Sequence, residues 1–446
     1  MKSRMAAIVY FCVGCIAALA ISFCLAAQTQ QRPAQYVVIA LSTLGGTDAA
    51  AQQVNSSGLI SGDSNLTGDT IEHAVLWRPD GTIIDLGTLG GPSSGGSQVN
   101  ENGLILGASE TASIDPLGEN WGMLFNCNLS GAPCEGYQHI VLAVTWQKGV
   151  MTALPTLGGN NAQVPPNTGL NNKGEAVGFA ENSTQDPSCA TPQVLDYEAV
   201  IWGPSRGEIR ELPPLPGDSI GGAFGINDVG QVVGTTGPCG FPSYSLARHA
   251  VLWQNGVVTN LPTLGGLMSN VALSINNQGQ TVGTSDLPGD TATHAVIWNG
   301  GKVMDLGTLP GDYFSFASGI NDKGQVIAQS CDINFNCRVA LWQNGVMTDL
   351  NALTPPGSLY LVVAQHINNQ GEITGTGFDP STGGTPAFLA IPCNSNRGGG
   401  NEGCVNGADV ASGGLDITNE HAKVILPDNI RNLFRSRWGW ASRTSR

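Results

Sequence analysis

The residues that could carry chemistry in this chain recur at matching places in a repeated phrase. Histidine opens one apolar segment in three copies, tryptophan closes that segment in six, and aspartate closes the next segment in three. Histidine is the side chain most often used for acid–base catalysis, and an aromatic face can stack on a ligand. The residues are His73, His249 and His294; Trp77, Trp146, Trp202, Trp253, Trp298 and Trp342; and Asp85, Asp305 and Asp349.

Comparison of the copies points to a structural role for all three types. The histidine position holds Leu142, Glu198, Arg338 and Pro386 in the other copies, so a shared catalytic role is not expected and the histidines are interpreted as residues that start a strand. A large ring repeated at one strand position favours packing between neighbouring units. The aspartates precede Gly-rich turns, where Asp is favoured on conformational grounds.

Motifs for the common hydrolytic and phosphoryl-transfer mechanisms are missing from the sequence. It contains no GxSxG, HExxH or Walker-type segment. We therefore expect no catalytic residue, no metal and no cofactor. Structural calcium at Asn227–Gly230 and Asn321–Gly324 is the alternative, although neither segment has the alternating acidic series that gathers six to eight oxygen ligands.

Cysteine usage indicates disulfide bonds. Three of the eleven cysteines lie in the first 27 residues, which leaves an even set of eight, the pattern expected of an exported chain. Short separations favour Cys127–Cys134, Cys331–Cys337 and Cys393–Cys404, which leaves Cys189 and Cys239 for each other. A zinc site is the competing interpretation, and the absence of a CxxC and of a nearby histidine pair counts against it.

The repeated phrase itself predicts the fold. Its asparagine recurs with gaps of 45, 71, 56, 49, 45 and 47 residues, a spacing typical of repeat architectures. Asn tolerates a left-handed backbone and Gly adopts positive φ freely, so the Asn-x-x-Gly pieces are interpreted as structural turns. The asparagines are Asn55, Asn100, Asn171, Asn227, Asn276, Asn321 and Asn368.

Each copy holds four short strands, as in one propeller blade. In the fifth copy these are Val271–Ile275, Gln280–Gly283, Ala295–Trp298 and Lys302–Leu306. The seventh copy lacks its fourth strand after Pro386–Ala390, and Tyr36–Leu41 precedes the first copy as a fourth strand should. The chain is therefore predicted to be all-β, a seven-bladed β-propeller of four-stranded blades, closed by an N-terminal strand that completes the last blade.

The D-L-G-T-L-G-G, I-N-x-x-G-x-V-x-G and H-A-V-x-W phrases resemble the HAF-repeat family of exported bacterial proteins over roughly residues 36–392. The family is defined by its repeat, so the resemblance implies a β-propeller-like extracellular fold and no activity. This chain departs from the family pattern in part. Its third motif residue is Val or Ala except at Phe388, and the seventh copy has Ala390 where the others have Trp.

The ends of the chain differ from the repeat. Residues 1–27 are interpreted as a signal peptide, with an uncleaved anchor as the alternative, and 28–35 as a linker before the propeller at 36–392. Residues 393–446 are a Gly-rich stretch followed by a basic and aromatic tail, which we expect to be mobile, with attachment to an anionic surface as the alternative. The chain is thus expected to be secreted or extracytoplasmic, and to meet a membrane only through an uncleaved N-terminal segment or this tail.

Charge excludes one class of partner. Residues 36–392 hold nine basic and 29 acidic side chains, a balance of −20 (9 − 29), so nucleic acid is not an expected partner.

The most informative asymmetry is in loop length. Between the second-strand glycine and the third strand, copies two to four carry 34, 19 and 14 residues, and the other copies carry nine or ten. Loops on a rigid scaffold are where binding residues concentrate, although surface loops also lengthen cheaply by drift. The aromatic residues in and beside these loops are the predicted ligand-binding set: Trp121, Phe125, Tyr137, Tyr197, Phe241 and Tyr244.

These observations predict a non-catalytic binding or surface-interaction module for an extracellular carbohydrate or protein. An extracellular polysaccharide hydrolase or lyase with carboxylates near the central channel is the alternative, because such enzymes need only two carboxylates placed by the fold. A structural protein without a small ligand is a third interpretation.

Overall fold

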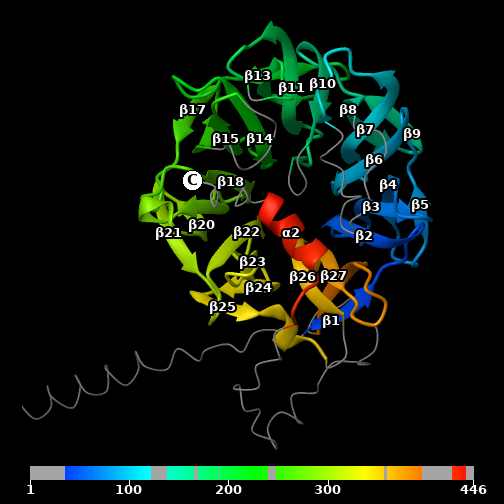
Figure 1. Ribbon diagram of the computed structural model, residues 1–446, viewed down its shortest axis with the longest axis vertical. Helices are drawn as coiled ribbons and strands as arrows, with labels where there is room; N and C mark the ends of the chain where they lie inside the picture. Colours follow the sequence, from blue (N-terminus) through cyan, green and yellow to red (C-terminus); the bar gives the residue numbers. More distant parts are fainter. Residues whose placement is uncertain are drawn as a thin grey trace, which may run out of the picture. The chain divides into compact units, whose positions relative to one another are not determined.

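The computed structural model describes residues 36–121, 138–164, 169–189, 191–239, 248–355, 359–393 and 424–437. Seven sheets of four antiparallel strands follow one another around a central axis (Figure 1). The protein is therefore a seven-bladed β-propeller, as predicted. From inner to outer strand, the blades are β2(Gly45–Val54), β3(Ile60–Leu66), β4(Glu72–Trp77) and β5(Ile83–Asp85); β6(Gly90–Val99), β7(Ile105–Ile114), β8(His139–Gln147) and β9(Val150–Ala153); β10(Gly158–Gln163), β11(Ala176–Gln185), β12(Leu195–Trp202) and β13(Ile209–Leu212); β14(Ile220–Ile226), β15(Val232–Gly237), β16(His249–Gln254) and β17(Val257–Asn260); β18(Asn270–Ile275), β19(Thr281–Asp286), β20(Thr293–Asn299) and β21(Lys302–Gly307); β22(Phe314–Ile320), β23(Val326–Cys331), β24(Cys337–Gln343) and β25(Val346–Asp349); and β26(Tyr360–Ile367), β27(Ile373–Phe378), β28(Ala387–Pro392) and β1(Tyr36–Ala40).

The ring closes through the N-terminal strand. β1 pairs antiparallel with β28, with Tyr36 opposite Pro392 and Ala40 opposite Phe388. In Figure 1 the blue β1 lies beside the last, orange strands of the chain. The first strand of the propeller therefore completes the last blade, which removes the exposed edge that a linear array would leave.

A tight contact between the two inner strands explains the glycine of the repeated Val-x-Gly phrase. In blade five the register of β18 shifts between Ala272 and Ser274, which marks a β-bulge opposite β19. A Cβ atom on Gly283 of β19 would lie 2.0 Å from the backbone oxygen of Val271. Any larger residue at Gly283 must therefore push the two strands apart. The same approach occurs at Gly62, Gly107, Gly178, Gly234 and Gly375.

The repeated asparagine ties each blade to the next. In blade five, Asn276 accepts hydrogen bonds from the backbone N–H groups of Gln278 and Gln280 through its Oδ1, which closes the turn between the two inner strands. Its Nδ2 donates to the backbone oxygen of Asn321 in blade six at 3.0 Å. Corresponding links run from Asn55 to Asn100, Asn100 to Asn171, Asn171 to Asn227, Asn227 to Asn276 and Asn321 to Asn368. The asparagine therefore closes a turn in its own blade and also links that blade to the next one by a hydrogen bond.

These contacts also occupy the oxygens considered for calcium. Asn227 Oδ1 accepts from Val229 and Gln231, and Asp228 Oδ1 accepts from the backbone N–H of Asn172 in the preceding blade. Asp322 Oδ1 likewise accepts from the N–H of Asn277. The acidic residue after the asparagine thus serves the same inter-blade linkage.

The motif tryptophans lie between blades. Trp77, Trp202, Trp253 and Trp298 are at most 2% exposed, and Trp146 is 3% exposed. Each of these five indole N–H groups donates to a backbone oxygen in the segment that crosses over from the preceding blade: Ser42, Leu86, Pro155, Pro213 and Pro262. Trp342 is partly buried against the apolar cluster of blades five and six.

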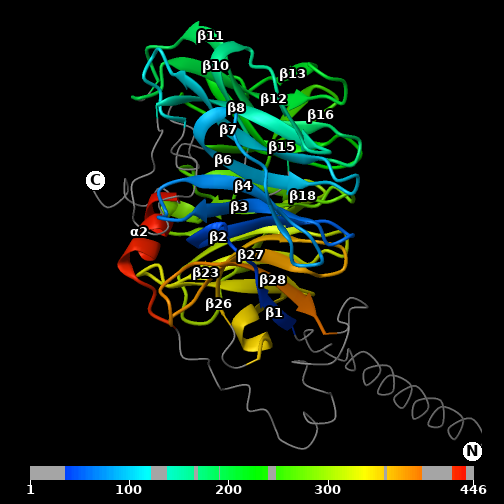
Figure 2. The same cartoon turned by 90° about the vertical axis from the view of Figure 1, so that its right-hand side faces the viewer.

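Part of the C-terminal tail is docked, which corrects the expectation of a wholly mobile tail. Residues 424–437 carry the helix α2 (Asp428–Arg437), and Leu426, Ile430 and Phe434 are buried in one cluster with residues of blades five to seven. The backbone N–H of Leu426 donates to Asn336 Oδ1 at 3.0 Å, in the loop between β23 and β24. Figure 2 shows α2 against one face of the ring. The sequence did not predict this docking, because the tail lies outside the repeat and the apolar residues of α2 meet their partners only in the folded ring.

Within the part of the chain that the structure describes, no helix combines the length and apolar character needed to cross a bilayer. The proposed signal peptide (1–27), the linker (28–35) and residues 394–423 and 438–446 lie outside the described residues.

Candidate functional site in the insertions of blades two to four

The insertions of blades two and three begin as hairpins that extend beyond the regular sheet. β7 and β11 are ten residues long, and each pairs with its third strand through a register shift, between Glu110 and Ile114 and between Glu181 and Gln185. A shift of this kind turns a strand away from the sheet plane. The hairpins therefore carry the insertions outward from the ring on ordered backbone.

A buried carboxylate joins these two hairpins. Glu119, at the end of the blade-two hairpin, has no exposed surface. Its Oε1 accepts hydrogen bonds from the backbone N–H groups of Val194 and Leu195 at 2.7 and 2.8 Å, and from Gln193 Nε2 at 3.0 Å. Trp121 donates from its indole N–H to Gln193 Oε1 at 3.2 Å. The insertion of blade two is thus fastened to blade three through one fully buried acceptor.

A second carboxylate completes this network. Glu181 Oε1 accepts from Gln193 Nε2 at 2.9 Å, and its Oε2 accepts from the backbone N–H of Asn161 at 2.8 Å. Burial raises the pKa of Glu181 to about 8, and the nearby Glu119 adds to the rise. The raised pKa of Glu181 favours its protonated form, which reduces the repulsion between two glutamates in one buried site. Both are buried, so substrate access to this pair requires the hairpins to open.

Two of the predicted ligand-binding aromatics lie in the core of this cluster. Trp121 and Tyr197 are 0% and 4% exposed. Their rings contact each other at 5.7 Å between centroids, and both contact Phe179, at 5.6 and 5.7 Å. Trp121 and Tyr197 thus support the loops from beneath and present almost no surface to a ligand. Phe125, Tyr137, Phe241 and Tyr244 lie outside the described residues and stay predictions.

Sequence reasoning missed the exposed apolar residues of the same hairpin. Ile114 is 56% exposed and Leu117 is 37% exposed, just before the buried Glu119. No position-by-position comparison could have found them, because these residues have no counterpart in the shorter loops. Both side chains give the described surface of blade two apolar area that a ligand could contact.

Two of the expected disulfides are present, and one of them joins neighbouring blades. Cys189, in the insertion of blade three, is bonded to Cys239 in the insertion of blade four. Cys331 is bonded to Cys337 across the β23–β24 hairpin of blade six. Cys393 is also disulfide-bonded, whereas its predicted partner Cys404, and the pair Cys127–Cys134, lie outside the described residues.

In blades one and five the motif histidine contacts the aspartate of the following strand, whereas His249 of blade four contacts Asp218, just before β14. His73 Nδ1 lies 3.0 Å from Asp85, and His294 Nδ1 lies 3.0 Å from Asp305. Asp85 and Asp305 stand opposite Val75 and Val296 in the neighbouring strand, and each histidine lies two residues before that valine. The imidazole can therefore be cationic beside the carboxylate. A histidine that pairs with its own strand neighbour stabilises the blade edge and needs no catalytic explanation.

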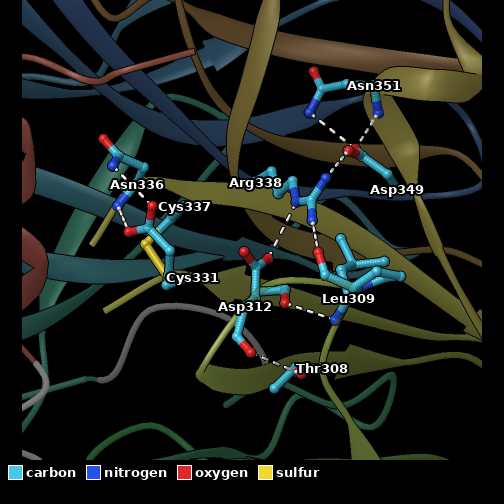
Figure 3. Close-up of polar contacts among 12 residues, drawn as sticks. Thr308, Leu309, Asp312, Cys331, Asn336, Cys337, Arg338, Asp349 and Asn351 are labelled. Atoms are coloured by element: carbon cyan, nitrogen blue, oxygen red, sulfur yellow. Dashed lines mark hydrogen bonds and ion pairs between the residues drawn. A yellow bond between two sulfur atoms is a disulfide. The ribbon is translucent and has the colours of Figure 1, made fainter. Parts of the chain in front are cut away.

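Arginine replaces histidine in blade six. Arg338 contacts Asp349 at 3.0 Å and Asp312 at 3.1 Å, as Figure 3 shows. Asp349 in turn accepts from the backbone N–H of Asn351, at the start of the short helix η4 (Leu350–Leu353). The pairing therefore survives a change of the basic residue.

Blade three breaks this pattern with two acids. Its register places Glu198 and Glu211 where blades one, five and six have the basic residue and the aspartate. Burial raises the pKa of Glu198 to about 8, and Glu211 and Asp196 add to the rise. One carboxylate oxygen of Glu198 is buried with no hydrogen-bond partner among the described residues. Blade three therefore carries an acidic cluster at the base of its insertion.

Comparison with known proteins finds no matching family model and no matching curated protein. Several solved structures are similar at low identity. A gluconolactonase from Xanthomonas campestris has a TM-score of 0.34 and 11% identity, over 81% of this chain and 99% of that one. A dipeptidyl peptidase 4 from Porphyromonas gingivalis has a TM-score of 0.40 and 10% identity, over 75% of this chain and 50% of that one. A lectin from Aleuria aurantia has a TM-score of 0.31 and 9% identity, over 80% of this chain and all of that one (100%).

The class of the protein thus follows from its own topology, a propeller module with inter-blade disulfide bonding. Disulfide bonds are compatible with an extracytoplasmic location.

Proposed function

We propose that this protein is an exported propeller of the HAF-repeat family that binds an extracellular carbohydrate or protein through the insertions of blades two to four. The observation that carries the proposal is the cross-linking of three neighbouring insertions. Glu119 fastens the blade-two insertion to blade three, and the Cys189–Cys239 disulfide fastens blade three to blade four. Loops held in this way lose little conformational entropy when they bind, which favours affinity.

The surface of the blade-two hairpin supports the same proposal. Ile114 and Leu117 are exposed beside the buried Glu119, so apolar surface is held in place by a rigid polar network. Aromatic residues of the remaining insertion segments add contact material of the kind enriched at binding surfaces.

The raised-pKa carboxyls favour binding over hydrolysis. Glu110, Glu181 and Glu198 each have a pKa raised to about 8, by burial in the first place, and they are 1%, 0% and 8% exposed. Glu110 accepts from the backbone N–H of Ser93, the role that Glu181 has toward Asn161. Glu110 and Glu181 thus hold the inner strands β6 and β10 of their own blades, whereas a glycosidase must present its carboxyls to the sugar.

The test deletes the tip of the blade-two insertion and keeps the residues that attach it to blade three. Residues 122–137 are replaced by a short Gly-Ser linker, which retains Glu119 and Trp121 and therefore the buried network. The variant and the parent chain are compared on an array of immobilised extracellular polysaccharides. We expect capture by the parent chain and loss of capture by the variant, with the unfolding transition unchanged.

The matched control replaces residues 67–70, in the short connection between β3 and β4, by the same linker. This control should retain capture. Equal capture by all three chains contradicts the proposal. Release of new reducing ends from a captured polysaccharide, abolished by one Asp→Asn or Glu→Gln change, would instead support the hydrolase or lyase.

A further inference from the structure

Four metal-ligating side chains converge where the insertions of blades three and four meet. They are Asp186, Cys189, Asp196 and Cys239, and one ligand atom from each lies within 4.8 Å of the others. Three come from the β11–β12 hairpin and the fourth follows β15, so the cluster spans two blades. It is the one such convergence of three or more His, Cys, Asp or Glu ligands among the described residues.

The local backbone holds two of these side chains, Asp186 and Cys189, in place. The N–H of Asp186 donates to the backbone oxygen of Val194, and Asp186 Oδ1 accepts from the N–H of Ser188 at 2.7 Å. The N–H of Cys189 then donates to the Asp186 backbone oxygen at 3.1 Å, which closes the turn. Asp186 and Cys189 are therefore placed by a tight turn at the tip of the hairpin, and their geometry does not depend on the disulfide alone.

Asp196 completes the carboxylate pair of the cluster. It stands opposite this turn at the start of β12, and its Oδ1 is buried with no hydrogen-bond partner among the described residues. Asp186 and Asp196 share a side-chain hydrogen bond. A proton therefore lies between the two carboxyl groups, and a divalent cation with two sulfur ligands beside it can take the place of that proton.

We propose that Asp186, Cys189, Asp196 and Cys239 bind a divalent transition-metal ion, with Zn²⁺ the best match, when the Cys189–Cys239 disulfide is reduced. Two thiolates and two carboxylates complete a tetrahedral site. Zn–S and Zn–O distances of about 2.3 and 2.1 Å place tetrahedral ligands roughly 3.4 to 3.8 Å apart. The four ligand atoms lie within 4.8 Å of one another, and reduction frees the two bonded sulfur atoms to separate to this spacing. Thiolate ligands select Zn²⁺ over the hard cations Ca²⁺ and Mg²⁺.

The exchange balances with a dithiol as the reductant. The dithiol gives two electrons and two protons to the disulfide, becomes a cyclic disulfide itself, and leaves two thiols at Cys189 and Cys239. Binding of Zn²⁺ then releases the two thiol protons and any proton on the aspartate pair. In the reverse direction an external disulfide takes the two electrons, the Cys189–Cys239 bond reforms and the ion leaves.

The consequence is a cross-link between blades three and four in either redox state. The disulfide of blade six offers a contrast, because Cys331 and Cys337 are direct partners across one hairpin. Opening that bond leaves the blades joined as before. Only the Cys189–Cys239 pair links two insertions, and only there do two aspartates stand beside the sulfur atoms within the described part of the chain.

The test uses the full chain reduced with a phosphine and then given Co²⁺ or Zn²⁺ without oxygen. Reduced chain should show the thiolate-to-Co²⁺ charge-transfer absorption and retain zinc through desalting, and oxidised chain should show neither. Asp196→Asn and Cys239→Ser should each weaken zinc binding by more than about tenfold, since even outer-shell partners of a metal site are worth that much.

The matched control is the Cys331→Ser/Cys337→Ser double variant, which should bind zinc as the parent chain does. Far-UV circular dichroism of every reduced chain checks that the fold persists, and a variant that unfolds is replaced by Asp186→Asn. Reduced parent chain without thiolate absorption overturns the proposal. Zinc binding that survives in Cys189→Ser/Cys239→Ser overturns it as well, since the metal then lies on other thiols.

Discussion

Replacement of Glu198 by glutamine should stabilise the propeller at neutral and alkaline pH. Glu198 is 8% exposed and, with Glu211 as its neighbour, stands in the place of the basic residue that pairs with an aspartate in blades one, five and six. Glutamine has nearly the same shape as the protonated glutamate and cannot ionise. The substitution therefore removes the cost of holding a charge at this buried position and leaves the packing unchanged.

The magnitude follows from the raised pKa of Glu198. A group whose folded-state pKa is raised contributes stability that is complete below its unfolded pKa and is lost as the pH rises through its folded pKa. For Glu198 that window runs from 4.5 to about 8. The linkage relation gives a loss of about 3 kcal/mol at neutral pH and about 4 kcal/mol at the upper end of the window. The glutamine variant should escape this loss.

The assay is urea unfolding of both chains at a pH near the lower end of the window and again near its upper end. The two chains should have nearly equal stability in acid, and the variant should be more stable by about 4 kcal/mol at the upper end. Glu110 and Glu181 titrate in the same direction, so only the difference between the chains reports on Glu198. Glu211→Gln is the control, because removal of this exposed neighbour should produce a smaller gain of the same sign.

Two results would refute this reasoning. Parallel pH dependence in parent and variant would mean that Glu198 ionises as freely in the fold as in the unfolded chain. A variant that is less stable at the upper end would mean that the Glu198 carboxylate makes a favourable contact there. Either outcome removes the interpretation of blade three as a broken charge pair.

Three further predictions test the repeat and the tail. Gly234→Ala should destabilise the fold by about 2 kcal/mol or more, because its Cβ would lie 2.0 Å from the backbone oxygen of Gly222; urea unfolding measures this, and an unchanged midpoint contradicts the close contact. Asn276→Ala should cost about 1 to 3 kcal/mol through its lost turn bonds and the lost link to Asn321, whereas a cost near zero in the same assay would mean that the inter-blade link is replaced by water. Phe434→Ala should release α2 and speed proteolytic removal of the tail while the propeller stays intact, since Phe434 is only 3% exposed in the docking cluster. Equal cleavage rates in parent and variant would show that Leu426 and Ile430 are enough to hold α2 on the ring.

The fold could be predicted from the repeat because the residues that specify its turns and strands act over short distances in the sequence. Asn276 and the glycine three residues later specify a turn by their own backbone preferences, whatever surrounds them. Strands of alternating Val and Ile between such turns have few other ways to pair. The fourth strand missing after Ala390 and the spare strand at Tyr36 then leave ring closure as the arrangement that pairs every edge.

The candidate site was less predictable because its contacts join distant segments. Trp121 looked like an exposed aromatic in a long loop, yet its indole N–H donates to Gln193, 72 residues further on. The Glu119 carboxylate reaches backbone groups 75 and 76 residues away. Which face of a loop is buried depends on what packs against it. These insertions have no equivalent in the other copies, so comparison of the copies cannot show which residues they contact.

The sequence by itself thus determined the blade, the number of blades and the way the ring closes, because turn propensities and strand periodicity act over a few residues and the chain repeats them. It also narrowed Cys189 and Cys239 to each other by elimination. Only the tertiary structure decided that Trp121 and Tyr197 support the insertions from within, that two aspartates stand beside the Cys189–Cys239 bond, and that Phe434 docks on the ring. Those outcomes depend on burial and on charge at short range between segments far apart in the chain, and both exist only once the blades are in place.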